Sequence, residues 1–172
     1  MLTLINTNRM LPPIAPIGLD YVAGAARRAG CHVELVDLNL SQDADALLAD
    51  HFGRCQPDLV GLSFRNADDC FWPSGESFVP VLQRDIATVR RHTAAPIVLG
   101  GVGYSIFPQS LLAATGADFG IHGDGEDATV CLLSEIRGHR RWDRVPGLIC
   151  RQDGALREIG RASCRERVCY VV

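Results

Sequence analysis

The chain has 172 residues, of which 47% are hydrophobic, and its formal net charge is −3. This length predicts one domain with a sizeable core, and the hydrophobic content excludes a disordered chain. The slightly acidic balance argues against a nucleic-acid or anionic-membrane surface, which would show a basic patch. No apolar run reaches about 18 residues and the first residues lack a signal-peptide pattern, so we expect a cytoplasmic protein that does not span a membrane.

Seven cysteines are scattered along the chain, with neither a CxxC nor a CxxxCxxC spacing among them. In a cytoplasmic protein, this odd and scattered set favours reduced structural thiols over disulfides. The five histidines show no metal-binding spacing either, although His122 falls near a predicted binding site. We therefore predict no metal-ligating residue and no catalytic residue in this chain.

Short apolar runs alternate with amphipathic segments, which is typical of a parallel sheet covered by helices on both faces. Strands are expected at residues 2–7, 32–38, 58–64, 96–100 and 117–122. Helices are expected at residues 17–29, 44–55, 105–115 and 126–137, with a further helix that follows Ser77 as its N-cap. Residues 65–75 read as a loop, and residues 145–157 as a short hairpin that turns on Asp153-Gly154. Five alternating strands and helices predict a doubly wound α/β fold with a five-stranded parallel sheet in the flavodoxin-like order 2-1-3-4-5.

In such a sheet, ligands bind outside the carboxyl ends of the strands, where the first and third strands diverge. The loop after the first strand, residues 6–18, contains three prolines that restrict its backbone before any ligand binds. A rigid connector would show the same prolines. After the third strand, Ser63-Phe64-Arg65-Asn66 brings a hydroxyl, a cation and an amide to this end, and Asp68 and Asp69 follow as acids or simple loop caps.

Glycines dominate the loops after the last two strands. Gly100-Gly101-Val102-Gly103 lacks large side chains, which we expect to let a flat or bulky ligand approach the backbone closely. His122-Gly123-Asp124-Gly125-Glu126 leads into the last helix, and its acidic residues suit helix capping. The same charges would repel a phosphate, so this loop is not predicted to bind an anion.

Several segments, taken in order, resemble the N-terminal cobalamin-binding domain of cobalamin-dependent radical S-adenosylmethionine enzymes. The segments are residues 12–19, Gly30 with 33–37, 57–63, 96–101, and 116–120 with the following Gly-x-Gly-Glu. The resemblance covers about residues 1–150 and implies cobalamin as the cofactor. It implies that the nucleotide tail enters near Ser63, Gly100 and Gly101, with the corrin ring over the loops after strands one and three. The cofactor-binding residues predicted on this basis are Asn8, Arg9, Pro13, Ile17, Ser63, Phe64, Arg65, Asn66, Gly100, Gly101, Gly103, Gly123, Gly125 and Glu126.

The loop after the first strand departs from one family pattern. Cobalamin carriers of the methionine synthase kind have a DxHxxG loop there, whose histidine ligates cobalt, but residues 6–18 contain no histidine. Arg9 and Arg65 cannot replace it, because a guanidinium stays protonated and offers no lone pair. The lower face of the cobalt is therefore expected to be open to water or to face a non-ligating side chain, with Arg65 as the candidate.

The resemblance also implies a larger parent protein, in which this domain serves a radical S-adenosylmethionine enzyme, expected to be a methyltransferase. The parent would bind S-adenosylmethionine and a 4Fe-4S cluster, whose ligands are not in this chain, so the chain alone is not expected to catalyse. We predict a cobalamin-binding domain at residues 1–143 and the start of a connection to the downstream domain at 144–158.

Residues 159–172, IGRASCRERVCYVV, do not fit the rest of the chain. Most of this segment resembles the translation of a common sequencing adapter, so we predict a non-native tail. The alternative is an ordinary basic C-terminal strand. Under the first interpretation, the chain is the front of a longer gene product.

Three other functions were weighed against cobalamin binding. A dinucleotide-binding protein could use Asp37 for a ribose, but the GxGxxG motif after the first strand is missing. A P-loop is absent as well, and a receiver domain would need an aspartate where Ser63 stands. A free-standing corrinoid carrier remains possible, although such carriers would be expected to supply the axial histidine.

Overall fold

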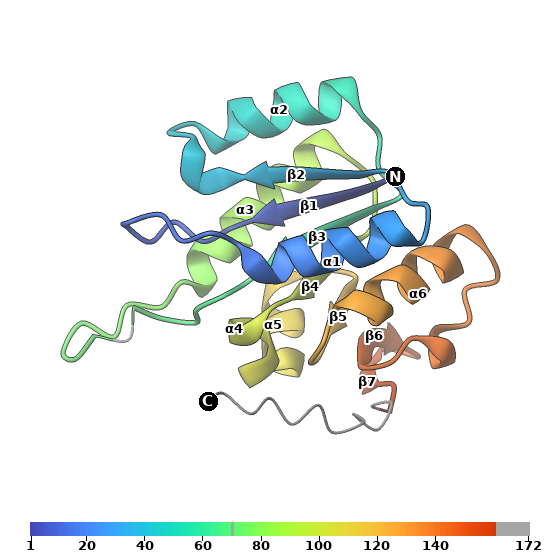
Figure 1. The fold of residues 1–172 in the computed structure, drawn as a ribbon. Helices are drawn as coiled ribbons and strands as arrows, with labels where there is room; N and C mark the ends of the chain where they lie inside the picture. Colours follow the sequence, from blue (N-terminus) through green and yellow to red (C-terminus); the bar gives the residue numbers. More distant parts are fainter. Residues whose placement is uncertain (70, 161–172) are drawn as a thin grey trace, which may run out of the picture.

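The computed structural model describes residues 1–69 and 71–160, and these residues form one sheet with helices on both faces (Figure 1). The strands are β1 Leu2–Asn6, β2 Val33–Asp37, β3 Leu59–Ser63, β4 Ile97–Gly100, β5 Phe119–Ile121, β6 Leu148–Gln152 and β7 Ala155–Glu158. The α-helices are α1 Ile17–Arg28, α2 Ala44–Arg54, α3 Val79–His92, α4 Val102–Ile106, α5 Pro108–Thr115 and α6 Glu126–Arg137. Two short 3₁₀ helices, η1 Leu38–Leu40 and η2 Trp142–Arg144, lie in the connections.

The sheet has the strand order β2-β1-β3-β4-β5-β6-β7. Its first five strands are parallel and follow the predicted order 2-1-3-4-5. The prediction of a five-stranded, purely parallel sheet was nevertheless wrong, because β6 and β7 extend it as antiparallel strands. The hairpin at Asp153-Gly154, where both residues have positive φ, returns β7 along the edge of β6, while β6 itself pairs with β5.

Two predicted helix features differ from the structure. The helix expected at residues 105–115 is two helices, α4 and α5, which are separated at Phe107. Pro108 begins the second helix because it lacks the N–H that a continuous helix would require. The N-cap of α3 is Phe78 rather than Ser77, although the Ser77 hydroxyl accepts a hydrogen bond from the Val79 N–H at 3.3 Å.

Alternate side chains of the strands divide the core between two faces of the sheet. On β1, Leu2 and Leu4 pack with buried residues of α1 and α6, whereas Ile5 packs with α2, α3 and α5. Figure 1 shows α1 and α6 on one side of the sheet and α3 on the other. The helices cover the two faces of the sheet, and the connecting loops gather at the carboxyl ends of the parallel strands.

A buried tyrosine shows how closely the β4–α4 connection packs on the sheet. Tyr104 in α4 is fully buried, and its hydroxyl has no hydrogen-bond partner among the described residues. Burial raises the pKa of the Tyr104 hydroxyl far above its ordinary value. A Cβ on Gly120 of β5 would lie 1.7 Å from the Tyr104 hydroxyl oxygen, so only glycine fits beneath this ring.

We expect Tyr104→Phe to leave the free energy of unfolding unchanged or to raise it by up to about 1 kcal/mol, because an unsatisfied buried hydroxyl is removed. Gly120→Ala, at the same contact, should instead lower it by more than about 2 kcal/mol through overpacking. Urea denaturation measures both variants. A loss above about 1 kcal/mol in Tyr104→Phe would show that the hydroxyl has a partner.

Candidate functional site at the carboxyl ends of the parallel strands

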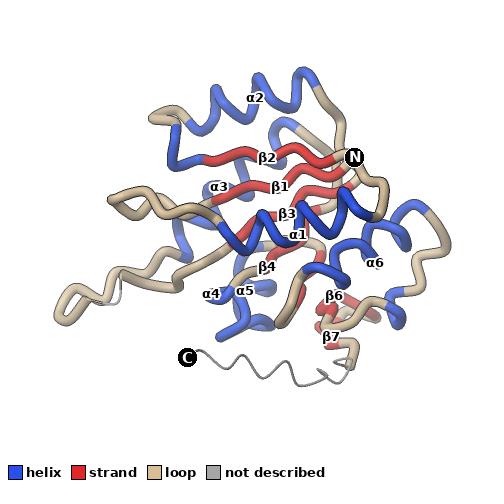
Figure 2. Tube along the Cα trace, viewed as in Figure 1, coloured by secondary structure: helices blue, strands red, loops and turns tan. Residues whose placement is uncertain are grey.

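Three neighbouring strands end at the same level of the sheet. In the strand register, Asn6 of β1 is paired with Ser63 of β3, and Ser63 is paired with Gly100 of β4. The loops that follow these residues therefore leave the sheet side by side, as the tube in Figure 2 shows. The β1–α1 loop and the β3–α3 loop diverge here to opposite faces, which is the arrangement predicted from the strand order.

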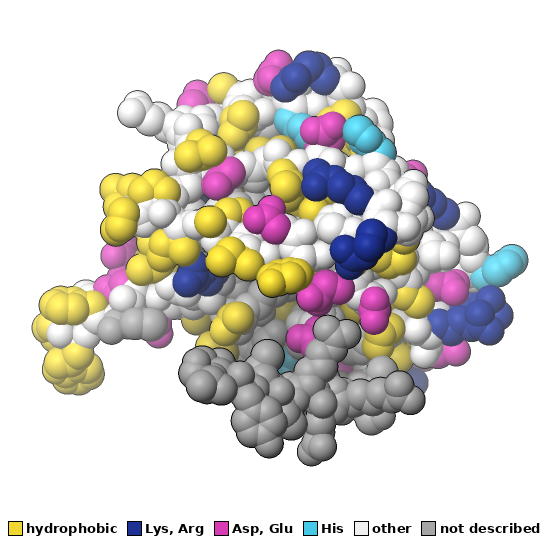
Figure 3. All heavy atoms as spheres, viewed as in Figure 1, with side chains coloured by type: hydrophobic (Ala, Val, Ile, Leu, Met, Phe, Trp, Pro, Cys, Tyr) yellow, Lys and Arg dark blue, Asp and Glu magenta, His cyan; other side chains and the backbone are white. Residues whose placement is uncertain are grey.

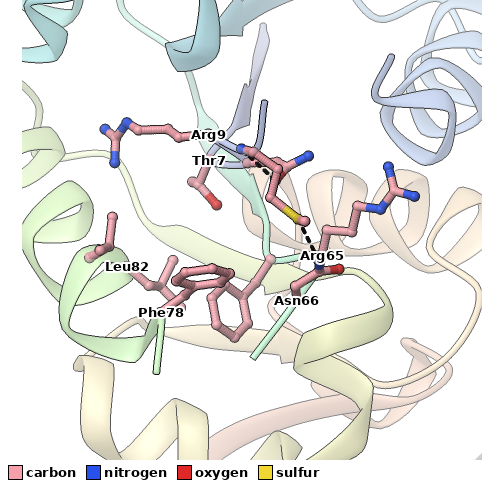
Figure 4. A pocket seen from close by; sticks show the side chains of 10 residues that line it. Thr7, Arg9, Arg65, Asn66, Phe78 and Leu82 are labelled. Carbon is pink, nitrogen blue, oxygen red and sulfur yellow. Dashed lines mark hydrogen bonds between the residues drawn. The ribbon is translucent and has the colours of Figure 1, made fainter. Parts of the chain in front are cut away.

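A cavity of about 170 Å³ lies at this divergence (Figure 4). The cavity has three walls. They are formed by the β1–α1 loop, by the start of the β3–α3 loop, and by α3 with the residue before it. The lining residues are Thr7, Asn8, Arg9, Met10, Phe64, Arg65, Asn66, Phe78, Val81 and Leu82. Five predicted cofactor-binding residues, Asn8, Arg9, Phe64, Arg65 and Asn66, thus come together here.

Hydrogen bonds hold the β1–α1 loop in place where it leaves the sheet. The Asn6 side chain donates to Asp37 Oδ1 at 3.0 Å and accepts the backbone N–H of Asn8 at 3.1 Å. Asn8 Oδ1 in turn accepts the N–H of Met10 at 3.3 Å. The Thr7 hydroxyl donates to the carbonyl of Ser63 at 2.8 Å and ties this loop to β3. The beginning of the loop is therefore fixed before any ligand binds.

The two arginines of the cavity have different surroundings. Both terminal nitrogens of Arg9 donate to Asp85 of α3, at 3.1 and 2.7 Å. Burial raises the pKa of the Asp85 carboxyl, whose side chain is only 7% exposed, and the hydrogen bonds from Arg9 oppose that shift. Arg65 is exposed and forms no hydrogen bond or ion pair with residues 1–69 or 71–160. Only Arg65 is therefore available to a ligand through an unengaged guanidinium.

Two of the glycines after β4 have a packing role that the sequence did not reveal. A Cβ on Gly101 would lie 2.7 Å from the Phe64 carbonyl oxygen, and one on Gly103 would lie 2.7 Å from the Arg65 carbonyl oxygen. Gly101 also has φ +105°, which disfavours other residues. These two glycines therefore admit the protein's own β3–α3 loop, and their contact with a ligand stays a prediction. At Gly100 nothing lies within 4 Å of the Cβ position, so the space beside this residue is open.

The remaining predicted residues do not line the cavity. Pro13 and Ile17 are exposed at the end of the β1–α1 loop, and Ser63 ends β3. In the β5–α6 loop, the N–H of Gly123 donates to the Ser105 hydroxyl at 3.2 Å. Gly125 is the N-cap of α6 and has no side chain that could cap it, and the acidic Glu126 lies in the first turn of this helix.

Five lining residues escaped the sequence-based site. Met10 and Thr7 lie in the loop that was selected, but neither carries a charge that would single it out. Phe78, Val81 and Leu82 line the cavity from α3 and the residue before it. The sequence contained no signal that these three residues line a cavity.

Exposed apolar side chains are abundant in the loops at this end of the molecule, and Figure 3 shows many of them on the corresponding side. The residues are Leu11, Ile14 and Ile17 after β1, Phe71 and Trp72 after β3, and Val102, Ile106 and Phe107 after β4. Trp72 is 92% exposed. Apolar surface concentrated around one edge is typical of a binding surface.

The fold and the site together define a doubly wound α/β domain that binds a ligand at the carboxyl ends of its parallel strands. Residues 5–133 match the B12 binding domain family. The chain therefore belongs to the B12-binding domain family, as the sequence resemblance predicted.

Two kinds of relative support this membership. The chain is 38% identical over 149 residues to a tryptophan 2-C-methyltransferase of Streptomyces laurentii. This match covers 85% of this chain and 25% of that protein. It is 33% identical, with a TM-score of 0.88, to the radical S-adenosylmethionine methyltransferase TsrM from Kitasatospora setae, solved with cobalamin and a [4Fe-4S] cluster bound. That match covers 92% of this chain and 30% of TsrM, so the chain spans less than a third of both relatives.

A more distant structure shares the fold alone. The cobalamin-dependent radical enzyme OxsB, solved with aqua-cobalamin bound, has a TM-score of 0.77 at 17% identity over 93% of this chain and 22% of OxsB. Among residues 1–69 and 71–160, no group of three or more histidine, cysteine, aspartate or glutamate side chains could hold a metal ion. No helix in the same part of the chain is long and apolar enough to cross a membrane.

Proposed function

We propose that this domain binds cobalamin over the carboxyl ends of β1, β3 and β4, as the N-terminal module of a radical S-adenosylmethionine methyltransferase. The observation that carries the proposal is the cavity between the β1–α1 and β3–α3 loops in a chain of the B12-binding family. The methyltransferase assignment rests on the two relatives that are 38% and 33% identical. In that parent, S-adenosylmethionine and a 4Fe-4S cluster would bind in a downstream domain, to which the chain would lead after β7, because β6 and β7 complete the sheet of this domain.

The residues present fit cobalamin as a ligand that lies over the cavity and not inside it. A cavity of about 170 Å³ is smaller than the roughly 300–1,000 Å³ of pockets that enclose a drug-sized ligand. A macrocycle as large as a corrin would therefore lie over the cavity, against the loops, with only a part inserted. The exposed Leu11, Ile17 and Val102 offer apolar surface for its face, and the open space at Gly100 leaves the end of β4 accessible.

Cobalamin, when bound, supplies a cobalt atom that can accept a methyl group and pass it on. The role of this chain is to hold and shield that group. No histidine stands in the β1–α1 loop, and Arg9 is engaged by Asp85. Arg65 is the cation that remains free to face the lower side of the cobalt, where a protonated guanidinium excludes a ligating base without binding the metal itself.

Electron paramagnetic resonance tests both the binding and this arrangement. Free cobalamin reduced to Co(II) carries its own tail base, whose nitrogen splits the signal. We expect the protein to remove this splitting, because the β1–α1 loop holds no histidine that could supply a nitrogen ligand and the tail base would be held away from the metal, in the open space near Gly100. Arg65→His should restore nitrogen splitting by placing a neutral imidazole at the same position. The spectrum is recorded on the protein fraction after desalting, which removes free cobalamin. A protein fraction without a cobalt signal would contradict cobalamin binding, and nitrogen splitting in the desalted wild-type complex would contradict the role of Arg65.

The dinucleotide alternative is weakened by the surroundings of Asp37. Its Oδ1 already accepts hydrogen bonds from the Asn6 side chain at 3.0 Å and from the Asn39 N–H at 2.9 Å, so that oxygen is engaged within the protein.

The greater length of both relatives favours a module of an enzyme over a free-standing carrier. The proposal places the protein in the cytoplasm, where thiols stay reduced, and the four cysteines described in the structure are free.

A further inference from the structure

A buried ion pair joins two walls of the cavity. Arg9 lies on the β1–α1 loop and Asp85 on α3, and both of these elements line the cavity. The two terminal nitrogens of Arg9 donate to separate oxygens of Asp85, at 3.1 and 2.7 Å. The Asp85 side chain is buried, on the same helix as the cavity residue Leu82. Figure 4 shows the guanidinium groups of Arg9 and Arg65 pointing away from each other, so Arg9 is turned away from the free cation.

Stability alone does not account for this pair. Taking two charges out of water is costly, and an apolar pair of similar volume is often as stable as a buried ion pair. What the ion pair adds is geometry, because the planar fork of a guanidinium meets a carboxylate in a defined orientation. The pair therefore fixes the β1–α1 loop at Arg9 relative to α3.

The place of Arg9 in its loop indicates what the pair controls. Before it, Thr7 and Asn8 are buried and hydrogen-bonded next to the sheet. After it, Met10 is held by the Asn66 amide, which donates to the Met10 sulfur at 2.8 Å. Residues 11–15 then follow, and all of them are exposed. Arg9 therefore stands where the loop changes from a buried segment to an exposed, largely apolar one.

We propose that Asp85 is a positioning residue for cobalamin, which acts through Arg9 to hold the exposed part of the β1–α1 loop against the macrocycle. The proposal rests on the proposed function and deepens it, because it gives a role in binding to a residue that does not touch the cofactor. Stability and affinity then depend on the pair in different ways. An apolar pair can replace it in the fold, but it cannot replace it in binding.

The double variant Arg9→Met with Asp85→Leu separates these two effects. It fills similar space without charges, so its melting temperature should stay within about 4 °C of wild type. Equilibrium dialysis should nevertheless show an affinity for hydroxocobalamin about tenfold or more below wild type, because binding must then order a looser loop. Arg54→Met with Asp50→Leu makes the same substitutions at an exposed ion pair of α2, outside the cavity. This control should bind hydroxocobalamin within about twofold of wild type.

Hydrogen exchange without cobalamin gives a measurement that does not depend on the cofactor. The backbone N–H of Met10 donates to Asn8 Oδ1 at 3.3 Å, directly after Arg9 in the loop. We expect this N–H to exchange at least about tenfold faster in the double variant Arg9→Met with Asp85→Leu, because the loop opens locally more often. The amides of β3 should keep their wild-type rates, since the global stability is matched.

Each outcome decides the inference. Wild-type affinity in the double variant would overturn it, as would unchanged exchange at Met10 or an equal loss of affinity in the α2 control. If the double variant does not fold, Asp85→Asn replaces it, since this change keeps one acceptor for Arg9 and loses the fork. Asp85→Asn should bind hydroxocobalamin at least about threefold more weakly than wild type, and equal binding would overturn the inference.

The affinity of wild type separates the inference from the proposed function. If wild type binds no hydroxocobalamin, the proposed function fails and the inference falls with it. If wild type binds hydroxocobalamin and the Asp85 variants bind it equally well, only the inference fails.

Discussion

Gly100→Trp should abolish cobalamin retention while the protein stays folded. No atom lies within 4 Å of the Gly100 Cβ position, and this residue ends β4 beside Ser63 of β3. A large ring at this point fills the space over the sheet edge that the cofactor is proposed to occupy. We expect at least about a hundredfold loss of affinity for cobalamin, because the indole ring and the cofactor cannot occupy the same space. The melting temperature should change by less than about 4 °C, since a change of 1 kcal/mol shifts it by about that amount.

Gly103→Ala is the matched contrast, a much smaller change that should damage the fold itself. The new Cβ would lie 2.7–2.9 Å from backbone atoms of Arg65 and Asn66, which cannot move as a flexible side chain would. We expect the free energy of unfolding to fall by about 2–3 kcal/mol, measured by urea denaturation. If Gly100→Trp unfolds the protein and Gly103→Ala leaves it stable, the assignment of these glycines is reversed.

Arg9→Met should destabilise the protein more than most single changes near the site. It leaves the Asp85 carboxylate buried and without its partner, at an expected cost of about 3 kcal/mol at pH 7. The figure is at the lower end for buried pairs because the Arg9 side chain is 35% exposed. Urea denaturation checks the value. The double variant Arg9→Met with Asp85→Leu removes both charges and should recover most of the loss.

The pH dependence of Arg9→Met follows from the same carboxyl. Burial raises the pKa of Asp85 in the folded protein above its value in the unfolded chain. The folded state therefore binds this proton more tightly, and stability falls as the pH rises through the folded-state pKa. Removal of Arg9 raises that pKa further, so the deficit of Arg9→Met should be largest near neutral pH and should shrink as the pH falls towards 4. A deficit that does not depend on pH would show that Asp85 is not the cause.

The fold was predictable from the sequence to the extent that it depends on local patterns. Alternation of apolar runs with amphipathic segments located each parallel strand, and chirality rules then left a small set of orders, among them the observed one. The division at Phe107 was missed because residues 105–115 keep a helical composition, and only Pro108 marks the new start. The pairing of β6 with β5 was missed because a hairpin pattern does not show which strand it will join.

The site was predictable where it depends on topology and not where it depends on contacts distant in sequence. Asn8 and Arg65 follow strands that had to end at the same edge, so their proximity could be anticipated. In the sequence, Gly103 indicated only that another group lies close to its backbone. The structure identifies that group as the backbone of Arg65. The Arg9–Asp85 pair joins residues 76 positions apart, and no periodic pattern connects them. Residues 161–172, most of the predicted tail, lie outside the described part of the chain.

Cobalamin binding by the purified chain is the central claim, and co-elution measures it most directly. The protein is mixed with equal amounts of hydroxocobalamin and NADH, desalted, and the eluted protein is scanned for visible and near-ultraviolet absorbance. We predict that hydroxocobalamin elutes with the protein at about one per chain, with no NADH. A protein peak that is free of cobalamin, or that carries NADH instead, would contradict the account.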